Sequence, residues 1–510
     1  MQEFEDYPFW DLIAEMAYKP GNETLRKGTY DKFKSLETGK TIYMFGCNDA
    51  CGLFIERFAS TYSIAGILDN SEARWGSKFC GLPVWKPSEV LPELQREDAV
   101  IIIALRLQAD TAANQLQQMG LRNCYGLGVL LSGMSPYREM VEQMERIRRQ
   151  PVEDIVMLES TNDFDGNAGA LYEYLKRGGS GHKFVWVIKN PANRRFLLDG
   201  KDVAVCPRAG RAEMEKYITY RAAAKWQIWD NYPIRKVRKE QTNVFLQHFG
   251  MGYKLIAGRY KSPEYIDYVL VVNESVYAYE KEALQYPATA KVLFGELPRN
   301  DVLFSDQWDE LSKITKHKYH KVIMWAPTLR ESAMFHRIDS DLEYPYGISL
   351  LYSEGDVRKL NDFLAERDML LLIKIHPRQK CNYTDNQYSN MRYLDSEAVK
   401  KVHAYKLLTQ VDAMITDYSS MVFDYMLLDR PIAWVLEDME HYKVPFLMEN
   451  PLDFMPGNHI YTMAELLDFL GQVSRGEDPC RSQRNTLSQQ YNAPKEGNGC
   501  RNIARTLGLE

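Results

Sequence analysis

Residues 413–436 read AMITDYSSMVFDYMLLDRPIAWVL, and this stretch indicates how the chain folds. A short apolar strand at its start (413–415) and another at its end (432–436) enclose the apolar-periodic segment MVFDYMLL, which predicts a helix. Ser419 or Ser420, just before that segment, is a favourable helix N-cap. Strand, helix and strand in succession are typical of a parallel α/β sheet.

The same alternation runs through most of the chain and predicts three α/β units. The expected strands of the first unit are Thr41–Gly46, Ser63–Leu68 and Val100–Ala104. Those of the second are Asp154–Leu158, Phe184–Ile188, Asn243–Leu246, Tyr268–Val272 and Lys291–Phe294. In the third, Val322–Trp325 and Leu370–Ile375 precede the two strands described above. Their near-continuous apolar character fits sheets that are covered on both faces.

Two stretches of different character separate these units. The charged segment Glu139–Gln150 predicts a connecting helix, and Pro151 marks the break after it. The polar stretch Asp306–His320 separates the second unit from the third. We therefore expect a Rossmann-like domain with its connecting helix at residues 1–150, a second domain at 151–310 and a third at 311–510.

Polar side chains follow four of the predicted strands at the point where each strand ends. The residues concerned are His248; Thr328 and Arg330; His376 and Arg378; and Asp417, Ser419 and Ser420. In parallel α/β sheets, ligands bind beyond the carboxyl ends of the strands. Because these ends belong to two domains, the sequence predicts a cleft between them, which is the arrangement of a GT-B transferase.

The two histidines are the candidate catalytic groups. An imidazole titrates near pH 6.5 and is the natural general base at neutral pH. His248 lies just before Gly250 and Gly252, in a loop where backbone can approach a ligand, and His376 sits at a fixed strand end. A lone histidine is more often structural, which is our interpretation of His317 and His403.

The serines and arginines indicate where a phosphate would bind. Ser419 and Ser420 could simply cap the helix, but the free N–H groups of a helix N-terminus also bind phosphate, and both roles are compatible. Arg330 and Arg378 carry planar donor groups that match phosphate oxygens.

The bulk composition excludes several classes of protein. Of the 510 residues, 45% are hydrophobic and 26% charged, as in an ordinary globular protein. The net charge of −6 argues against general nucleic-acid binding. Eight cysteines are too few for a disulfide scaffold, and the acidic N-terminus is not a signal peptide. Without an apolar run of about 20 residues, we expect a cytoplasmic protein whose contact with a membrane is at most peripheral.

Three basic clusters, at residues 146–149, 235–239 and 313–321, leave two interpretations open. They are either solvated faces or a docking site for an anionic membrane or a phosphate-rich product.

Several segments together resemble one known family, the CDP-glycerol glycerophosphotransferases, which include teichoic-acid polymerases and primases. The segments are WAPTLRES (325–332), IKIHPR (373–378), GELPRND (295–301), QHFGMGYK (247–254) and the long block at 414–442. The resemblance covers about residues 151–465, and the long block is its most specific part.

The resemblance implies a GT-B fold with an acceptor-side domain at 151–310 and a CDP-donor domain at 311–510. It also implies transfer of glycerol phosphate from CDP-glycerol to a hydroxyl of a polymer or lipid-linked acceptor. His248 and His376 match the family's two essential histidines. The residues implied in substrate binding are Arg330, Thr328, Asp417, Ser419, Ser420, Lys254, Arg299 and Arg378. No dedicated metal site is implied, and a requirement for Mg²⁺ is left open.

This sequence departs from the common pattern around His248. Phe249 separates His248 from Gly250, and Lys254 falls six residues after the histidine instead of five. The departure leaves open whether glycerol, ribitol or another alditol is transferred. We expect His248 to take the acceptor proton and His376 to stabilise charge on the phosphate, although the two roles could be exchanged.

Two other functions remain as alternatives. One is a GT-B glycosyltransferase that uses a nucleotide sugar, and the other is a non-catalytic polymer-binding protein. The sequence sets neither the acceptor nor the oligomeric state.

The first domain resembles the Rossmann-like modules attached to polysaccharide enzymes. Gly46 and Gly52 follow its first strand and Asp69 ends the next, as in a dinucleotide fingerprint, but Asn48 replaces the middle glycine. An accessory role and a bound nucleotide are the two interpretations.

Overall fold

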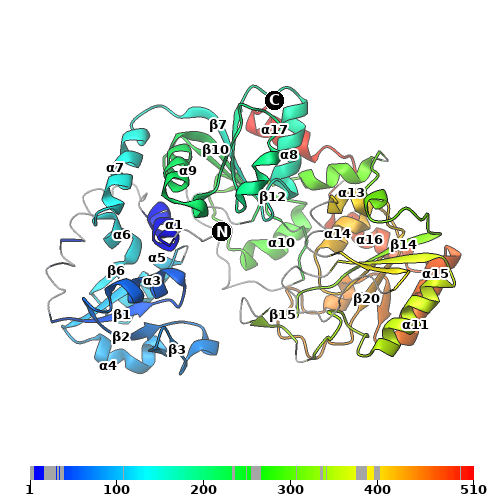
Figure 1. Ribbon diagram of the computed structural model, residues 1–510, viewed down its shortest axis with the longest axis horizontal. Helices are drawn as coiled ribbons and strands as arrows, with labels where there is room; N and C mark the ends of the chain where they lie inside the picture. The colour runs from blue at the N-terminus through cyan, green and yellow to red at the C-terminus, as the bar shows by residue number, and fades with distance from the viewer. Residues whose placement is uncertain are drawn as a thin grey trace.

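The computed structural model contains three large sheets, and the second lies between the other two (Figure 1). It describes residues 5–16, 30–31, 34, 39–106, 108–231, 236–248, 250–253, 266–305, 307–332, 337–340, 342–374, 388–394, 402–493 and 495–510. Neighbouring strands within these sheets pair in parallel, except β3 with β4. The predicted α/β class with three Rossmann-like units is confirmed.

The first sheet has the strand order β3-β4-β2-β1-β5-β6. Its strands are β1 (Thr41–Phe45), β2 (Ser63–Leu68), β3 (Lys78–Phe79), β4 (Leu82–Trp85), β5 (Ala99–Ile103) and β6 (Cys124–Gly126). The helices of this unit are α1 (Tyr7–Met16), α3 (Asp49–Phe58), α4 (Leu91–Leu94), α5 (Ala109–Gln118), α6 (Leu127–Ser132) and α7 (Tyr137–Arg148). The sequence predicted β1, β2 and β5, because strands of two to four residues such as β3, β4 and β6 carry too little pattern.

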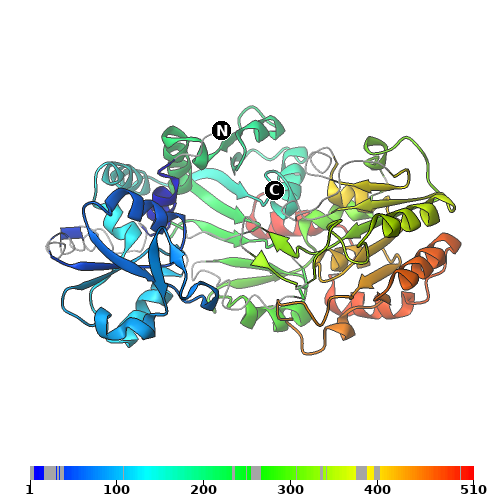
Figure 2. The same ribbon diagram turned by 60° about the horizontal axis from the view of Figure 1, so that its bottom comes forward.

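Helix α7 is the predicted connection between the first and second sheets, and it begins two residues earlier than expected. Its buried face (Met140, Val141 and Met144) packs toward helix α9 (Arg211–Ala223) of the second unit. The two units therefore share one continuous apolar core, and Figure 2 shows the first sheet beside the second.

The second sheet has the order β13-β12-β11-β10-β7-β8-β9. Its strands are β7 (Glu153–Glu159), β8 (Lys183–Val187), β9 (Val203–Val205), β10 (Ala224–Trp229), β11 (Thr242–Phe245), β12 (Tyr268–Val271) and β13 (Lys291–Phe294). Helices α8 (Gly166–Arg177), α9 and α10 (Glu274–Ala283) flank it. Strand β10 lies at the centre of the sheet but was missed, because Lys225 and Gln227 interrupt its apolar pattern.

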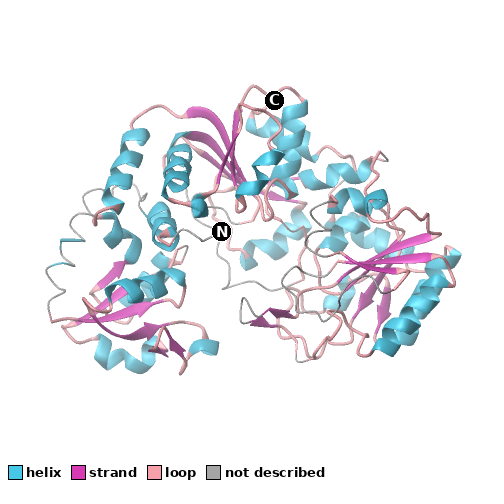
Figure 3. Ribbon diagram, viewed as in Figure 1, coloured by secondary structure: helices cyan, strands magenta, loops and turns pink. Residues whose placement is uncertain are grey.

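The third sheet has the order β18-β17-β14-β19-β20-β21. Its strands are β14 (Lys321–Ala326), β17 (Met369–Ile373), β18 (Met391–Tyr393), β19 (Ala413–Thr416), β20 (Ile432–Val435) and β21 (Asn458–Ile460), and β15 (Glu331–Ser332) pairs separately with β16 (Arg337–Ile338). Its helices are α11 (Glu354–Ala365), α13 (Ala404–Leu408), α14 (Met421–Met426), α15 (Met463–Arg475) and α16 (Arg481–Tyr491). Alternate residues of β14 enter different apolar clusters, so both faces of the sheet are covered, as expected (Figure 3).

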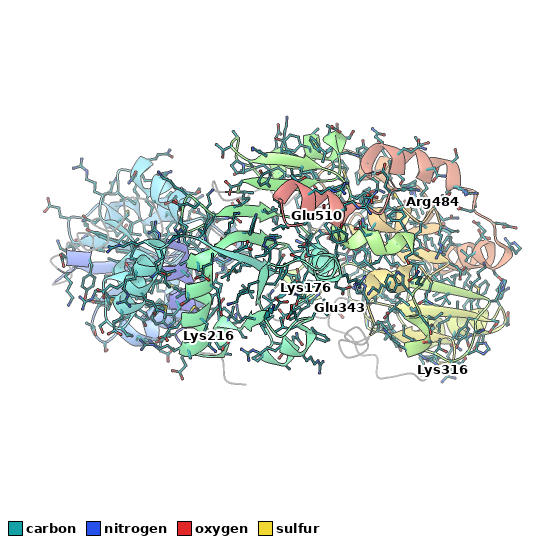
Figure 4. All side chains as sticks on the ribbon, turned by 90° about the horizontal axis from the view of Figure 1, so that it is seen from above. Lys176, Lys216, Lys316, Glu343, Arg484 and Glu510 are labelled. Atoms are coloured by element: carbon teal, nitrogen blue, oxygen red, sulfur yellow. The ribbon has the colours of Figure 1, made fainter. Side chains whose placement is uncertain are left out.

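The C-terminal helix α17 (Gly499–Leu507) leaves the third unit and packs on α8 and on the 3-10 helix at Pro298–Phe304. The carboxylate of Glu296 accepts the backbone N–H groups of residues 496–498, and that of Asp301 accepts those of 499 and 500. In Figure 4 the chain end at Glu510 lies over the second unit, where Tyr174 of α8 donates a hydrogen bond to it. The domain boundaries near residues 150 and 310 stay predictions.

Candidate active site

His248 follows strand β11 at the carboxyl edge of the second sheet, as predicted. Its side chain stays accessible to solvent, which a group that meets a substrate hydroxyl requires. A ring N–H donates to the backbone carbonyl of Asp230, at the end of β10. Crowding by protein atoms and the nearby charge of Arg299 lower the pKa of the imidazole to about 4. The ring is therefore neutral at pH 7, with one nitrogen fixed and the other able to accept a proton.

The backbone before His248 is held in an unusual conformation. Gln247 has a φ of 48°, in the left-handed region that side chains other than glycine seldom adopt. Asn167, at the start of α8, donates to the carbonyl oxygens of Leu246 and Gln247 at 3.3 and 2.6 Å. The Gln247 amide donates to the carbonyl of Leu270 in β12 at 2.6 Å. Contacts from two neighbouring elements thus fix the direction in which His248 leaves the sheet.

Arg299 joins His248 to the third unit. It is only 4% exposed, and its Nη1 donates to the backbone carbonyl of His248 at 2.5 Å. Its Nη2 pairs with Asp424 of helix α14 at 2.9 Å, and Tyr405 donates to the same carboxylate at 2.7 Å. The structure therefore places Arg299 beside the predicted base, where it acts as an internal link between the two units.

Asp230 and Lys374 are two ionisable groups of this region that the sequence analysis did not assign. Burial raises the pKa of the Asp230 carboxyl well above its usual range, although the backbone N–H of Asn167 donates to it at 2.9 Å. Lys374 follows strand β17, and burial lowers its pKa while the charge of Asp165 in the second unit opposes that shift. The strand ends of the two units thus face each other. A lysine closing an apolar strand was the available signal for Lys374.

The predicted donor-side residues form an internal network. Asp417, after β19, accepts the backbone N–H of Thr328 at 2.9 Å as well as its hydroxyl. Arg330 pairs with Asp417 at 2.8 Å and with Asp438, after β20, at 2.6 Å. The network ties together the carboxyl ends of three adjacent strands.

The guanidinium of Arg330 is also enclosed by aromatic rings. It lies 5.0 Å from the ring centre of Tyr418 and 4.9 Å from that of Tyr442. Direct contact of Arg330, Thr328 and Asp417 with a substrate stays a prediction, since all three are engaged with one another.

Ser419 and Ser420 lie half-buried at the start of α14. Ser420, one of the two predicted N-cap residues, occupies the N-cap position, but its backbone is already helical and its side chain makes no capping hydrogen bond with the described part of the helix. The helix is also shorter than expected and ends at Met426. Both serines therefore directly precede the first helical residue of α14, Met421.

Comparison with known proteins decides the family. Residues 142–508 match the family described as CDP-Glycerol:Poly(glycerophosphate) glycerophosphotransferase. The chain belongs to this family. The predicted resemblance is confirmed, and with it the assignment of the chain as a transferase of this class.

Two curated relatives and one solved structure illustrate how the similarity is distributed. The chain is 23% identical to the teichoic acid poly(glycerol phosphate) polymerase of Bacillus subtilis (strain 168), over 64% of this chain and 45% of that protein. It is 22% identical to the teichoic acid glycerol-phosphate transferase of Staphylococcus aureus (strain NCTC 8325 / PS 47), over 71% of this chain and 94% of that protein. The fold is similar to that of the wall teichoic acid polymerase TagF, with a TM-score of 0.56, 19% identity and coverage of 73% of this chain and 92% of that one.

Three of the predicted site residues, His376, Arg378 and Lys254, lie outside the described residues of this family member. Within the described ranges, no group of three or more histidine, cysteine or acidic side chains could hold a metal ion. None of the helices described has both the length and the apolar character of a membrane span.

Four cations of the predicted basic clusters make contacts within the fold of the transferase. Lys236 pairs with Asp267 at 2.6 Å, and Arg238 donates to the backbone carbonyls of residues 147 and 222. Lys313 pairs with Glu310, and Lys321 with Asp412. These contacts give those four side chains a structural role, and a docking role for the clusters stays a prediction.

The turn after β1 uses its polar groups internally. Asn48 caps helix α3 and also donates to the carbonyl of Ala104 at 2.7 Å, and Asp69 accepts the backbone N–H of Cys47. A Cβ on Gly46 would lie 2.5 Å from the Leu105 side chain, so the glycine lets the turn pack against that residue. The geometry favours an accessory role for the first unit over nucleotide binding.

Proposed function

We propose that this enzyme transfers glycerol phosphate, or a related alditol phosphate, from a CDP-activated donor to a hydroxyl of a teichoic-acid-like or capsular polymer. One observation carries the proposal: an accessible, neutral His248 is held by Asp230 and Arg299 at the carboxyl edge of a sheet. The family match supports the substrate class. TagF has been studied in a histidine variant soaked with CDPG, which supports the same donor.

In the proposed reaction, an acceptor hydroxyl attacks the phosphorus that carries the alditol. The hydroxyl proton moves to the ring nitrogen of His248 that does not donate to Asp230, and the bond from that phosphorus to the bridging oxygen breaks. CMP leaves with the bonding electrons, and His376 stabilises the charge on the phosphate. Positioning and charge neutralisation are the main requirements of phosphoryl transfer, and proton transfer by one such base contributes about 10²–10⁴-fold.

On the donor side, we propose that Ser419 and Ser420 contact the diphosphate together with the first N–H groups of α14. The Arg330 network would shape this loop by holding Thr328 and Asp417 in place. The third sheet would thus supply the donor site and the second sheet the acceptor site.

The test is to incubate the protein with CDP-glycerol, CDP-ribitol or UDP-sugars plus a short acceptor, and to identify the released nucleotide by mass. Release of CMP is expected. Release of a nucleoside diphosphate would instead establish the alternative, a nucleotide-sugar glycosyltransferase. His248→Ala should abolish turnover, while His317→Ala, at an exposed histidine paired with Asp368, should leave it unchanged.

We also propose peripheral contact with an anionic membrane, through the segment at residues 194–198. Phe196 and Leu198 are 42% and 55% exposed, and Arg195 lies over the Phe196 ring at 5.0 Å. Exposed apolar side chains beside cations suit the interface of an anionic lipid surface. Co-sedimentation with phosphatidylglycerol vesicles should fall in a Phe196→Ser, Leu198→Ser double variant. Tyr461→Ser, at another exposed aromatic, is the matched control, and equal binding of all three proteins would reject the proposal.

A further inference from the structure

A lysine follows strand β17 at the carboxyl edge of the third sheet. The backbone N–H of Lys374 donates to the carbonyl of Trp325 in β14 at 2.8 Å, so the ladder between the two strands fixes where the side chain leaves the sheet. The side chain is half-buried, and none of the described residues forms an ion pair or a hydrogen bond with its ammonium. The reaction proposed above gives this cation no role.

The sheet register places Lys374 on the same edge as the proposed donor site. Strand β14 lies between β17 and β19, and Ile373 and Ile415 flank Trp325 on its two sides. Neighbouring strands lie about 4.8 Å apart, so Lys374 leaves the sheet two strands away from Asp417 and at nearly the same level. The lysine is thus part of the strand-end surface that carries the Arg330 network.

The other charges at this edge cannot neutralise a diphosphate. Arg330 pairs with both Asp417 and Asp438, so one cation is shared by two carboxylates and the set has a net charge of −1. A CDP-activated donor brings further negative charge on each of its two phosphates. Among the described residues at these strand ends, Lys374 is the cation that no carboxylate neutralises.

The second unit indicates which of the two phosphates Lys374 would meet. Asp165 lies near enough to act on the charge of Lys374 but forms no ion pair with it. The next residue, Gly166, packs so closely on Asp230 that an added Cβ would lie 2.0 Å from its carboxylate, and the carbonyl of Asp230 accepts the ring N–H of His248. Lys374 therefore faces the part of the second unit that holds the base. The phosphoryl group that moves must lie between that base and the departing nucleotide.

We propose that the ammonium of Lys374 binds the phosphoryl group that is transferred and neutralises the charge that develops there as the bond from phosphorus to the bridging oxygen breaks. The inference rests on the proposed function in taking a CDP-activated donor, and it adds a residue that touches the substrate. Without a donor, the ammonium is enclosed without a paired counter-charge, which is unfavourable and lowers its pKa. A bound phosphate would relieve this cost.

Calorimetry with CDP and CMP tests the contact without turnover, because CMP lacks the terminal phosphate. The wild type should bind CDP more tightly than CMP. In Lys374→Met this preference should fall about tenfold or more, the usual effect of losing one charge-assisted hydrogen bond, while the Kd of CMP stays within about twofold.

Turnover and stability complete the test. With CDP-glycerol, kcat of Lys374→Met should fall about 10²–10³-fold, as when one fixed donor at developing charge is removed. In urea without ligand, the same variant should unfold at the wild-type midpoint or above it, because it removes an enclosed cation that has no ion-pair partner. Lys359→Met, at an exposed position of helix α11 in the same unit, is the matched control and should behave as the wild type in all three assays.

The inference is overturned if folded Lys374→Met keeps the wild-type preference for CDP, or if it weakens CMP as much as CDP while its urea midpoint falls, as expected of a structural lysine. If Lys374→Met does not fold, Lys374→Gln, which is neutral but polar, decides by the same ratio of Kd values. Should the wild type release no CMP from CDP-glycerol, the proposed function fails separately. The preference for CDP over CMP then still decides the inference, and a wild type without that preference would overturn it.

Discussion

The buried pair of Arg299 and Asp424 should be among the most sensitive contacts of the transferase. Asp424→Asn replaces the carboxylate with a neutral amide. The guanidinium of Arg299 then stays buried, 4% exposed, without a negatively charged partner from the third unit. Removing one partner of a buried ion pair costs about 3–5 kcal/mol, because the remaining charge has lost its hydration as well as its partner. Asn300 and Tyr405 also donate to this carboxylate, so an amide leaves their hydrogen bonds partly satisfied, and we expect the lower half of that range.

The assay is urea unfolding, monitored by tryptophan fluorescence. Turnover is measured in parallel on the folded variants without urea. The matched control is Glu477→Gln, which breaks an exposed pair with Arg475 and should leave the transition midpoint unchanged because water screens the charges. Turnover should fall in Asp424→Asn, since Arg299 also holds the carbonyl of His248. A loss of stability below about 1 kcal/mol, the size expected of a surface pair, would refute the account of Arg299 as a link between the units.

Four further predictions concern single residues. In ¹³C-histidine spectra, assigned with His248→Gln, the His248 ring should titrate near pH 4, so that about 97% of it is neutral at pH 5.5 against about 9% of an ordinary histidine; titration above pH 6 would contradict the structure. Because this pKa is lower in the folded state, the unfolded chain binds more protons between pH 4 and 6.5, so stability rises as the pH is raised through that window, and it should rise less steeply in His248→Gln. Gly166→Ala would place a Cβ 2.0 Å from Asp230 at a φ of 65° and should lower both stability and turnover, whereas Gly179→Ala, at a φ of 75° with open space around it, carries the backbone strain alone; equal effects would exclude the contact with Asp230. Ser353→Ala removes the capping box of α11 and should cost about 1 kcal/mol in urea unfolding with unchanged turnover, and a change in turnover would mean that α11 communicates with the site.

The sequence was sufficient for the features that depend on local pattern. Apolar runs located most of the longer strands, and the residues directly after them, such as His248 and Asp417, were correctly placed at strand ends. The predicted family rested mainly on the block at 414–442, because that motif is long and specific. The family match over residues 142–508 confirms it.

The remaining parts of the site depend on contacts between distant segments. Arg299 and Asp424 are 125 positions apart, and nothing in either local sequence shows that they meet. Asp230 was overlooked since its strand, β10, has no clean apolar pattern.

The return of helix α17 to the second unit has a mechanical consequence. The chain crosses between the second and third units twice, once after residue 304 and again before residue 499. Two separate crossings restrict the movement of one unit relative to the other more than a single crossing would. Glu296 and Asp301 fasten the second crossing through five backbone N–H groups. Together with the buried pair of Arg299 and Asp424, the two crossings favour one fixed placement of the second unit against the third.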